Sequence, residues 1–182
     1  MEPRRIYVDL EYCYPSMTRE SGRPSDSDLR QIVQIAAIKI DPKTGKELEA
    51  LDLLVHPAFE KRLPTFFTDL TGISQKMLHK RAVTFPEALK EFEKFCGSAH
   101  VWTFNNDWSV FKQNCGYFNI LFVLAPFTKV RDILPDWGID PQEYSSGTLH
   151  KAAGIVMRGH VHNALHDVRS MAAAVHFFET SN

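Results

Sequence analysis

The chain has 182 residues, with 21 basic and 22 acidic side chains and a formal net charge of −1. This length suits one domain with a substantial core, so we expect a single domain over residues 1–182. The near-neutral charge excludes a long basic surface for duplex nucleic acid, but it leaves room for a short strand held in a metal-loaded pocket. The 3 cysteines lack a C-x-x-C motif, which disfavours a disulfide framework and a zinc knuckle and favours a reducing, cytoplasmic setting.

No segment of the sequence is suited to a membrane. Residues Met1–Arg5 lack the apolar run of a signal peptide, and the longest apolar stretch, Phe118–Phe127, is far too short to span a bilayer. We therefore expect no membrane partner.

The first half of the chain predicts three strands. Apolar residues dominate 5–12, 32–41 and 47–56, and the turn sequence "PKTGK" joins the last two. Residues 13–30 are polar and rich in proline, glycine and serine, which indicates a loop. The three strands are therefore expected to form an antiparallel meander.

The second half predicts helices that alternate with strands. Thr84 and Glu87 form a capping box before an amphipathic helix that Gly97 ends. The patterns that follow predict a strand at 100–104, a helix at 107–116, a strand at 127–133 and a last helix from about Asn163 to Thr180. Three strands followed by this alternation predict one α/β domain with a mixed sheet.

Two acidic residues interrupt the first apolar strand. Asp9 and Glu11 are two positions apart, so their side chains project from the same face of the strand. Two carboxylates at that spacing repel each other and raise each other's pKa unless a cation lies between them. A divalent metal ion explains the pair, although a lone D-x-E is more often part of a strand with a solvated outer face.

Two further acids stand where helices begin. Asp107 follows a predicted strand and opens a helix, where an ordinary N-cap residue is the simpler explanation. Asp167 lies in the first turn of the last helix, at the border of its apolar face, where an acid also favours the helix dipole. His162 stands just upstream and could act as a base beside a metal site, whereas His166 is predicted to point away from the core.

These acids are expected to meet at one face of the sheet. Four carboxylates that converge without a metal ion would be very costly, because like charges would be brought together away from water. Two divalent cations roughly 4 Å apart would balance the four negative charges, and such a pair is suited to phosphoryl transfer. If Asp107 does not take part, Asp132 is the best substitute, because it also follows a predicted strand.

The acids and their neighbouring motifs resemble those of the DEDD exonuclease superfamily, in the same order. The sequence carries "DLE" at 9–11, "DLTGIS" at 69–74, Asp107 after a strand and "HNALHD" at 162–167. The spacing of His162 and Asp167 is similar to that of the DEDDh branch, whereas the DEDDy branch would have tyrosine where Asn163 stands. The resemblance covers nearly the whole chain and is strongest to the Eri-1 type RNA exonucleases, with RNase T more distant.

The resemblance implies an RNase H-like exonuclease fold, in which a mixed five-stranded sheet is flanked by helices. It implies that two Mg²⁺ or Mn²⁺ ions are held by four carboxylates, those of Asp9, Glu11, Asp107 and Asp167. All-oxygen ligands suit these hard cations and disfavour zinc. Glu11 would also take part in catalysis, and His162 would be the general base that accepts a proton from the attacking water.

The resemblance also implies a reaction and a substrate. The protein would be a 3′–5′ exonuclease that releases nucleoside 5′-monophosphates from single-stranded RNA or DNA, with RNA favoured. Leu10 would lie near the terminal nucleotide, and Ile73 would pack against its base. Several DEDDh enzymes act as dimers, so the resemblance allows a homodimer, although the residues indicate no interface.

Other residues carry weaker signals. Gln31 stands where many relatives have an acid, and we expect little effect because it is not a ligand. Three arginines of the 13–30 loop could contact a substrate backbone, although a solvated loop explains them equally well: Arg19, Arg23 and Arg30. Three tryptophans could stack on bases, although core packing explains the first of them better: Trp102, Trp108 and Trp137.

Two other functions are compatible with the sequence. A catalytically inactive member of the fold would serve as a binding module, but such relatives usually lose a ligand or the histidine, and here every one of these positions is filled. A phosphodiesterase acting on short or cyclic nucleotides would use the same kind of site. Comparing a dinucleotide, a longer strand and a cyclic dinucleotide as substrates separates this last function from the exonuclease.

Overall fold

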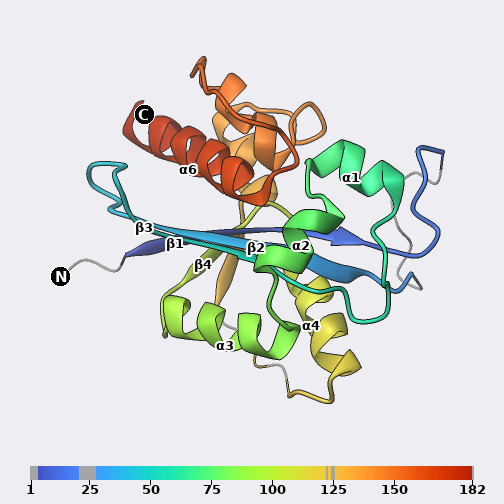
Figure 1. Ribbon diagram of the computed structural model, residues 1–182. Coiled ribbons are helices and arrows are strands. Elements are labelled where there is room, and N and C mark those ends of the chain that lie inside the picture. Colours follow the sequence, from blue (N-terminus) through green and yellow to red (C-terminus); the bar gives the residue numbers. More distant parts are fainter. Residues whose placement is uncertain (1–3, 21–27, 122, 124–125, 182) are drawn as a thin grey trace.

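The computed structural model describes residues 4–20, 28–121, 123 and 126–181. Its centre is a 5-stranded mixed sheet with the strand order β3-β2-β1-β4-β5 (Figure 1). β2 pairs antiparallel with both β1 and β3, whereas β4 runs parallel to both β1 and β5. The strands are β1 (Arg5–Cys13), β2 (Gln31–Ile40), β3 (Glu47–Leu54), β4 (Val101–Thr103) and β5 (Phe127–Lys129). The predicted mixed five-stranded sheet and its antiparallel meander are confirmed.

The predicted strand at 127–133 is wrong in its second half. β5 pairs with β4 only from Phe127 to Lys129, and β4 itself ends at Thr103. A longer β5 would have no neighbour on that side for its backbone N–H and C=O groups. The chain instead turns at once into the short helix α5 (Val130–Ile133).

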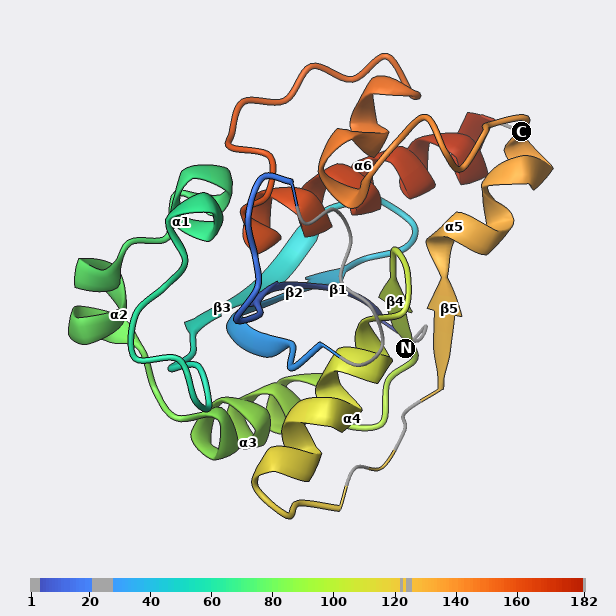
Figure 2. The same cartoon turned by 90° about the vertical axis from the view of Figure 1, so that its right-hand side faces the viewer.

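Helices cover both faces of the sheet. α3 (Phe85–Cys96) and α4 (Asp107–Tyr117) lie against one face, and α6 (Ala164–Ser181) lies against the other (Figures 1 and 2). The capping box of Thr84 and Glu87 starts α3, and Gly97 follows its last residue with a positive φ of 56°, as the sequence predicts.

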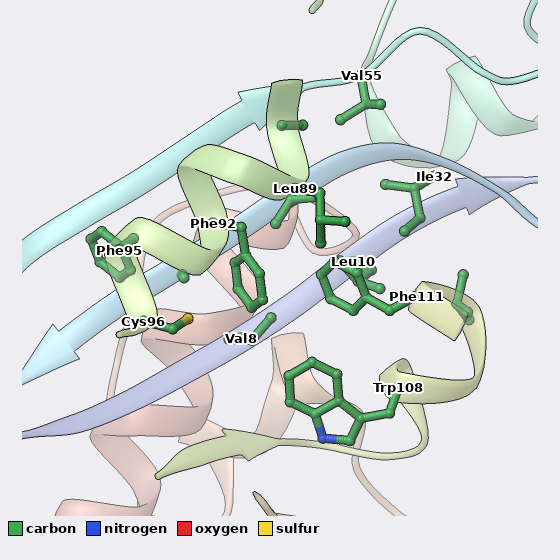
Figure 3. Packing of buried hydrophobic residues seen from close by; sticks show 14 of the residues in the cluster. Val8, Leu10, Ile32, Val55, Leu89, Phe92, Phe95, Cys96, Trp108 and Phe111 are labelled. Carbon is green, nitrogen blue, oxygen red and sulfur yellow. The ribbon is translucent and has the colours of Figure 1, made fainter. Parts of the chain in front are cut away.

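The core between β1 and the helices α3 and α4 fixes the direction of the β1 side chains. Phe92 and Phe111 stack with ring centroids 4.9 Å apart, and Val8 and Leu10 project from β1 into this cluster (Figure 3). Because side chains alternate along a strand, Asp9 and Glu11 must project from the opposite face, toward α6.

Short helices complete the fold and were not indicated by the sequence patterns. They are α1 (Thr65–Thr71), α2 (Gln75–Arg81) and the 3-10 helices η1 (Leu134–Trp137) and η2 (Ser146–Lys151). Each is too short to display an apolar period. α1 and α2 contribute Phe67 and Leu78 to a separate buried cluster with Cys13 of β1.

The cysteines and the lengths of the helices can be compared with what the composition predicts. All 3 cysteines are buried and free, as expected for a chain without a disulfide framework. Within the residues that the structure describes, no helix has the length and apolar character needed to cross a bilayer.

Candidate active site

Asp9 and Glu11 are buried on the α6 side of β1, with exposed fractions of 7% and 9%. Across the antiparallel ladder, Asp9 pairs with Ala36 and Glu11 with Gln34. The register of β1 and β2 shifts directly after Glu11, between Glu11 and Tyr12. Such irregularities locally re-aim side chains, and they are common beside active sites. The simple explanation of a solvated outer strand face therefore does not apply to this pair.

Asp107 is the first residue of α4, and Asn106, not Asp107, occupies the N-cap position. The Oδ2 atom of Asp107 is buried and has no hydrogen-bond partner within the described structure. Burial raises the pKa of this carboxyl to about 7, although hydrogen bonds from the backbone of Asp107 and Asn105 oppose the shift. An N-cap role therefore does not explain this acid, and its buried Oδ2 atom is available to bind a cation.

Asp167 lies in the first turn of α6 and is 3% exposed. Its Oδ1 atom is buried without a hydrogen-bond partner in the part of the chain that the structure describes. Its carboxyl accepts hydrogen bonds from the His162 backbone and, over 3.4 Å, from the Ser146 hydroxyl. Burial nevertheless raises the pKa of Asp167 to about 7.

The four predicted acids are close enough to act on one another electrostatically. The pKa of Asp9 is raised well above its usual value, first by burial and then by the charges of Asp107, Asp167 and Glu11. The pKa of Glu11 is raised well above its usual value by burial, then by Asp167 and Asp107. Like charges held this close in a buried place disfavour ionisation unless a cation compensates them.

His162 lies beside these acids in an uncommon backbone conformation, with φ of +68°. This left-handed region is strained for a residue other than glycine, and such strain tends to occur at functional sites. One ligand atom each from His162, Glu11 and Asp167 lie within 4.8 Å of one another. Burial, followed by the charge of His160, lowers the pKa of His162 below 6.5. The imidazole is therefore neutral near pH 7 and able to accept a proton.

A cavity of about 380 Å³ is lined by three of the four acids, Asp9, Glu11 and Asp167, and by His162. Its other lining residues are mostly apolar or aromatic: Leu10, Tyr12, Tyr14, Met17, Phe66, Leu70 and Ser146. Leu10 borders this cavity while it also belongs to the core cluster on the opposite face of β1. Ile73 is 1% exposed in the cluster with Phe67, so it does not line the cavity, and its contact with a base stays a prediction.

The structure separates the weaker candidates from this site. Asp132 is exposed in α5, and Arg30 donates hydrogen bonds to Gln113 and Ser109 of α4. Arg19 is exposed, and Arg23 lies outside the described residues. The three tryptophans pack against other side chains, namely Trp102 under Arg5, Trp108 beside Phe111 and Trp137 on Phe178.

The prediction that His166 points away from the core is wrong. His166 is 8% exposed, and its ring lies edge-on to that of His150, with centroids 5.9 Å apart. The sequence pattern predicted only one buried face on α6, the face toward the sheet. The packing of η2 against α6 buries a second face, and a short 3-10 helix leaves no periodic signal that could have revealed this.

Sequence reasoning also missed Ser146, which contacts the site, and Gln34, which lies opposite Glu11 on β2. Ser146 hydrogen-bonds with Asp167, and Gln34 accepts a hydrogen bond from the backbone N–H of Ala164, where α6 begins. Neither residue belongs to a motif. The only sequence signal was the polar Gln34 within the mostly apolar β2, which also contains Gln31 and Lys39.

Comparison with known proteins identifies the family and the fold. The family model of the RNase_T exonucleases matches residues 18–175, and no curated protein sequence matched the chain. The nuclease domain of 3′hExo, a DEDDh family member bound to rAMP, is a similar structure, with a TM-score of 0.83 at 17% identity over 99% of this chain and 93% of that chain.

Two further solved structures have the same fold. Cell-death related nuclease 4 (CRN-4) gives a TM-score of 0.80 at 16% identity, over 99% of this chain and 64% of that one. Exonuclease I of E. coli, in a zinc-bound complex with single-stranded DNA, gives 0.71 at 15% identity, over 100% and 41%. The family match begins after Asp9 and Glu11, but these structural alignments cover nearly all of the chain. The chain therefore belongs to the RNase T family of exonucleases, with the RNase H-like fold found in the DEDDh nucleases.

Proposed function

We propose that this protein is a metal-dependent 3′–5′ exonuclease that releases nucleoside 5′-monophosphates from single-stranded nucleic acid. The observation that carries the proposal is the meeting of four carboxyls beside one neutral histidine. Asp9, Glu11 and Asp167 are buried, and Asp107 is half-buried with its Oδ2 atom inaccessible to solvent. They come from three separate elements, β1, α4 and α6, and the charges of neighbouring acids add to burial in raising the pKa values of Asp9 and Glu11. A fold would not retain such a cluster for stability, because burying like charges destabilises it.

The residues present fit divalent cations. Buried oxygens of Asp107 and Asp167 lack hydrogen-bond partners within the described structure, and the donor set of the four acids is all oxygen. Hard cations such as Mg²⁺ and Mn²⁺ prefer such donors. Asp9, Glu11, Asp107 and Asp167 would hold two of these ions. When bound, the ions would lower the pKa of a water molecule and stabilise the charge on the scissile phosphate.

The protein's own side chains supply the remaining functions. His162 would accept the proton of the attacking water, because its ring is neutral near pH 7 and lies next to Glu11 and Asp167. The 380 Å³ cavity would receive the 3′-terminal nucleotide, with Leu10 at its border and the aromatic ring of Phe66 in its wall. Aromatic walls suit bases of any identity, because every base presents a π-face.

RNA is the favoured substrate in this proposal. The support is that the similar 3′hExo domain was solved with rAMP and that another similar structure is described as recognising a histone mRNA stem-loop. Exonuclease X, however, was solved with duplex DNA, so the fold itself accommodates both sugars. A homodimer and a cytoplasmic location stay predictions.

The test is to follow the shortening of 5′-labelled single-stranded RNA and DNA with Mg²⁺, with Mn²⁺ and with EDTA. We expect a metal-dependent ladder from the 3′ end that forms faster on RNA. Asp107→Asn should abolish it, whereas the matched variant Asp132→Asn, which changes an exposed acid, should leave it intact. Binding without shortening would favour an inactive binding module. Hydrolysis only of a dinucleotide or a cyclic dinucleotide would favour the phosphodiesterase.

A further inference from the structure

The first two residues of η2, Ser146 and Gly147, lie directly against Asp167. The Ser146 hydroxyl is 3.4 Å from Asp167 Oδ2, and it also hydrogen-bonds with the carboxyl of Asp9. A serine hydroxyl has only one hydrogen to donate, so it serves one of these two carboxyls at a time. Ser146 thus connects the acid of β1 to the acid of α6.

Gly147 provides the space that the Asp167 carboxyl occupies. A Cβ atom at this position would lie 2.3 Å from Oδ1, 2.7 Å from Cγ and 2.8 Å from Oδ2 of Asp167. These three nearest atoms all belong to one carboxyl. The backbone of Gly147 is not among the described glycines with positive φ, so its conformation is open to other residues. The close approach of Asp167 is therefore the physical reason for glycine here.

His150 connects η2, including the turn formed by Ser146 and Gly147, to α6. Its Nδ1 atom lies 2.9 Å from Ser170 Oγ, its backbone N–H donates to the same oxygen over 3.2 Å, and its ring hydrogen-bonds with the backbone of Gly147. Ser170 follows Asp167 by nearly one helical turn, so these bonds fix η2 and α6 together beside Asp167. The capping box between Ser145 and Thr148 holds the turn from its other side.

We propose that the Ser146–Gly147 turn is a positioning element that aims the Asp167 carboxyl at the cation site, with Gly147 supplying space and Ser146 a hydrogen bond. The inference rests on the proposed function, in which Asp167 is a cation ligand. Partners that orient a metal ligand are typically worth about 10- to 100-fold in metal affinity or activity.

The first test compares Gly147→Ala with Gly116→Ala in the full chain. Gly116 is a matched control, because a Cβ there meets no atom within 4 Å and its φ is not positive. Mn²⁺ binding, measured by calorimetry, should weaken about 10- to 100-fold in Gly147→Ala and stay unchanged in Gly116→Ala. Ser146→Ala should also weaken Mn²⁺ binding, and Ser146→Thr should restore it by keeping the hydroxyl. Unchanged Mn²⁺ affinity in Gly147→Ala would overturn the proposal.

The second test measures thermal stability without metal, where a general packing defect and a specific contact differ. Gly147→Ala should lower Tm in the natural chain but not in an Asp167→Ala background, because the clashing carboxyl is then absent. An equal loss of Tm in both backgrounds would overturn the proposal. If Gly147→Ala alone fails to fold, a folded Gly147→Ala/Asp167→Ala variant supports the contact, and failure of both variants contradicts it.

These readouts separate the inference from the proposed function. If the natural chain binds Mn²⁺ and shows the coupling between Gly147 and Asp167 but shortens no strand, the positioning role stands and the exonuclease proposal fails. If strands are shortened while Gly147→Ala keeps full Mn²⁺ affinity, the exonuclease proposal stands and the positioning role fails.

Discussion

His162 offers the most direct test at the scale of a single residue. Burial lowers its pKa below 6.5, so its neutral form is already dominant near pH 7. With saturating Mg²⁺, we expect the hydrolysis rate to increase with pH in the range below pH 6.5, as His162 loses its proton. The rate should then be constant from about pH 7. His162→Ala should remove this rise and lower the rate about 10²- to 10⁴-fold. Rate measurements from pH 5 to 8 check both outcomes.

His160 is the matched control for this prediction. It stands two residues away, is exposed, and contacts the backbone oxygen of Leu70 through Nε2. Its charge is the second cause that lowers the pKa of His162. His160→Ala should therefore move the rising part of the profile to higher pH while leaving the level rate nearly unchanged. A loss of rate as large as that of His162→Ala would show that the base has been wrongly assigned.

At the scale of elements, the start of α6 is tied to the strand that faces Glu11. Gln34 of β2 accepts a hydrogen bond of 3.0 Å from the N–H of Ala164 and donates one of 2.7 Å to Asp52 Oδ1. The N–H groups of a first helical turn have no partner within the helix, and that of Ala164 is bonded in a buried setting. This link sets the place of His162 and Asp167 relative to Glu11.

Gln34→Met tests that link, because it keeps the volume of the side chain and removes both hydrogen bonds. Leaving a buried N–H group without a partner typically costs about 1–3 kcal/mol, so urea unfolding should show a loss of this order. Hydrolysis should slow as well, through the displaced start of α6. Asp52→Asn keeps an oxygen that Gln34 can bond and should change the stability by less than about 0.5 kcal/mol. Equal losses in both variants would contradict the role given to Gln34.

Some elements of the fold could be predicted from the sequence, and others could not. The first three strands and α3 were predictable, because their apolar periods and the capping box of Thr84 are local signals. The meeting of the four acids was inferred from two positions in the first strand and two positions at the starts of later helices. Three features were not predictable from the sequence: the short length of β5, the burial of His166, and the space that Gly147 leaves for the Asp167 carboxyl. Each depends on packing against a segment that is distant in the sequence.

At the scale of the whole molecule, the acid cluster makes the metal-free protein sensitive to pH. Asp107 and Asp167 have pKa values of about 7, and the pKa values of Asp9 and Glu11 are also raised. Between about pH 4 and 7 the folded state therefore holds more protons than the unfolded state. Stability that depends on these protons is complete below the unfolded pKa values near 4 and is lost as pH rises through the folded ones.

We therefore expect Tm in EDTA to fall by several degrees between pH 5 and pH 8, and Mg²⁺ to restore it at pH 8, because a ligand of the folded state stabilises it. Asp107→Asn should make the decrease in Tm between pH 5 and pH 8 smaller, because it removes one of the carboxyls whose ionisation causes the decrease. Asp132→Asn should leave the decrease in Tm unchanged. Thermal scans at each pH, with and without Mg²⁺, check these outcomes. A Tm that stays level or rises toward pH 8 in EDTA would mean that the four carboxyls ionise freely, and the electrostatic argument for a cation site would then fail.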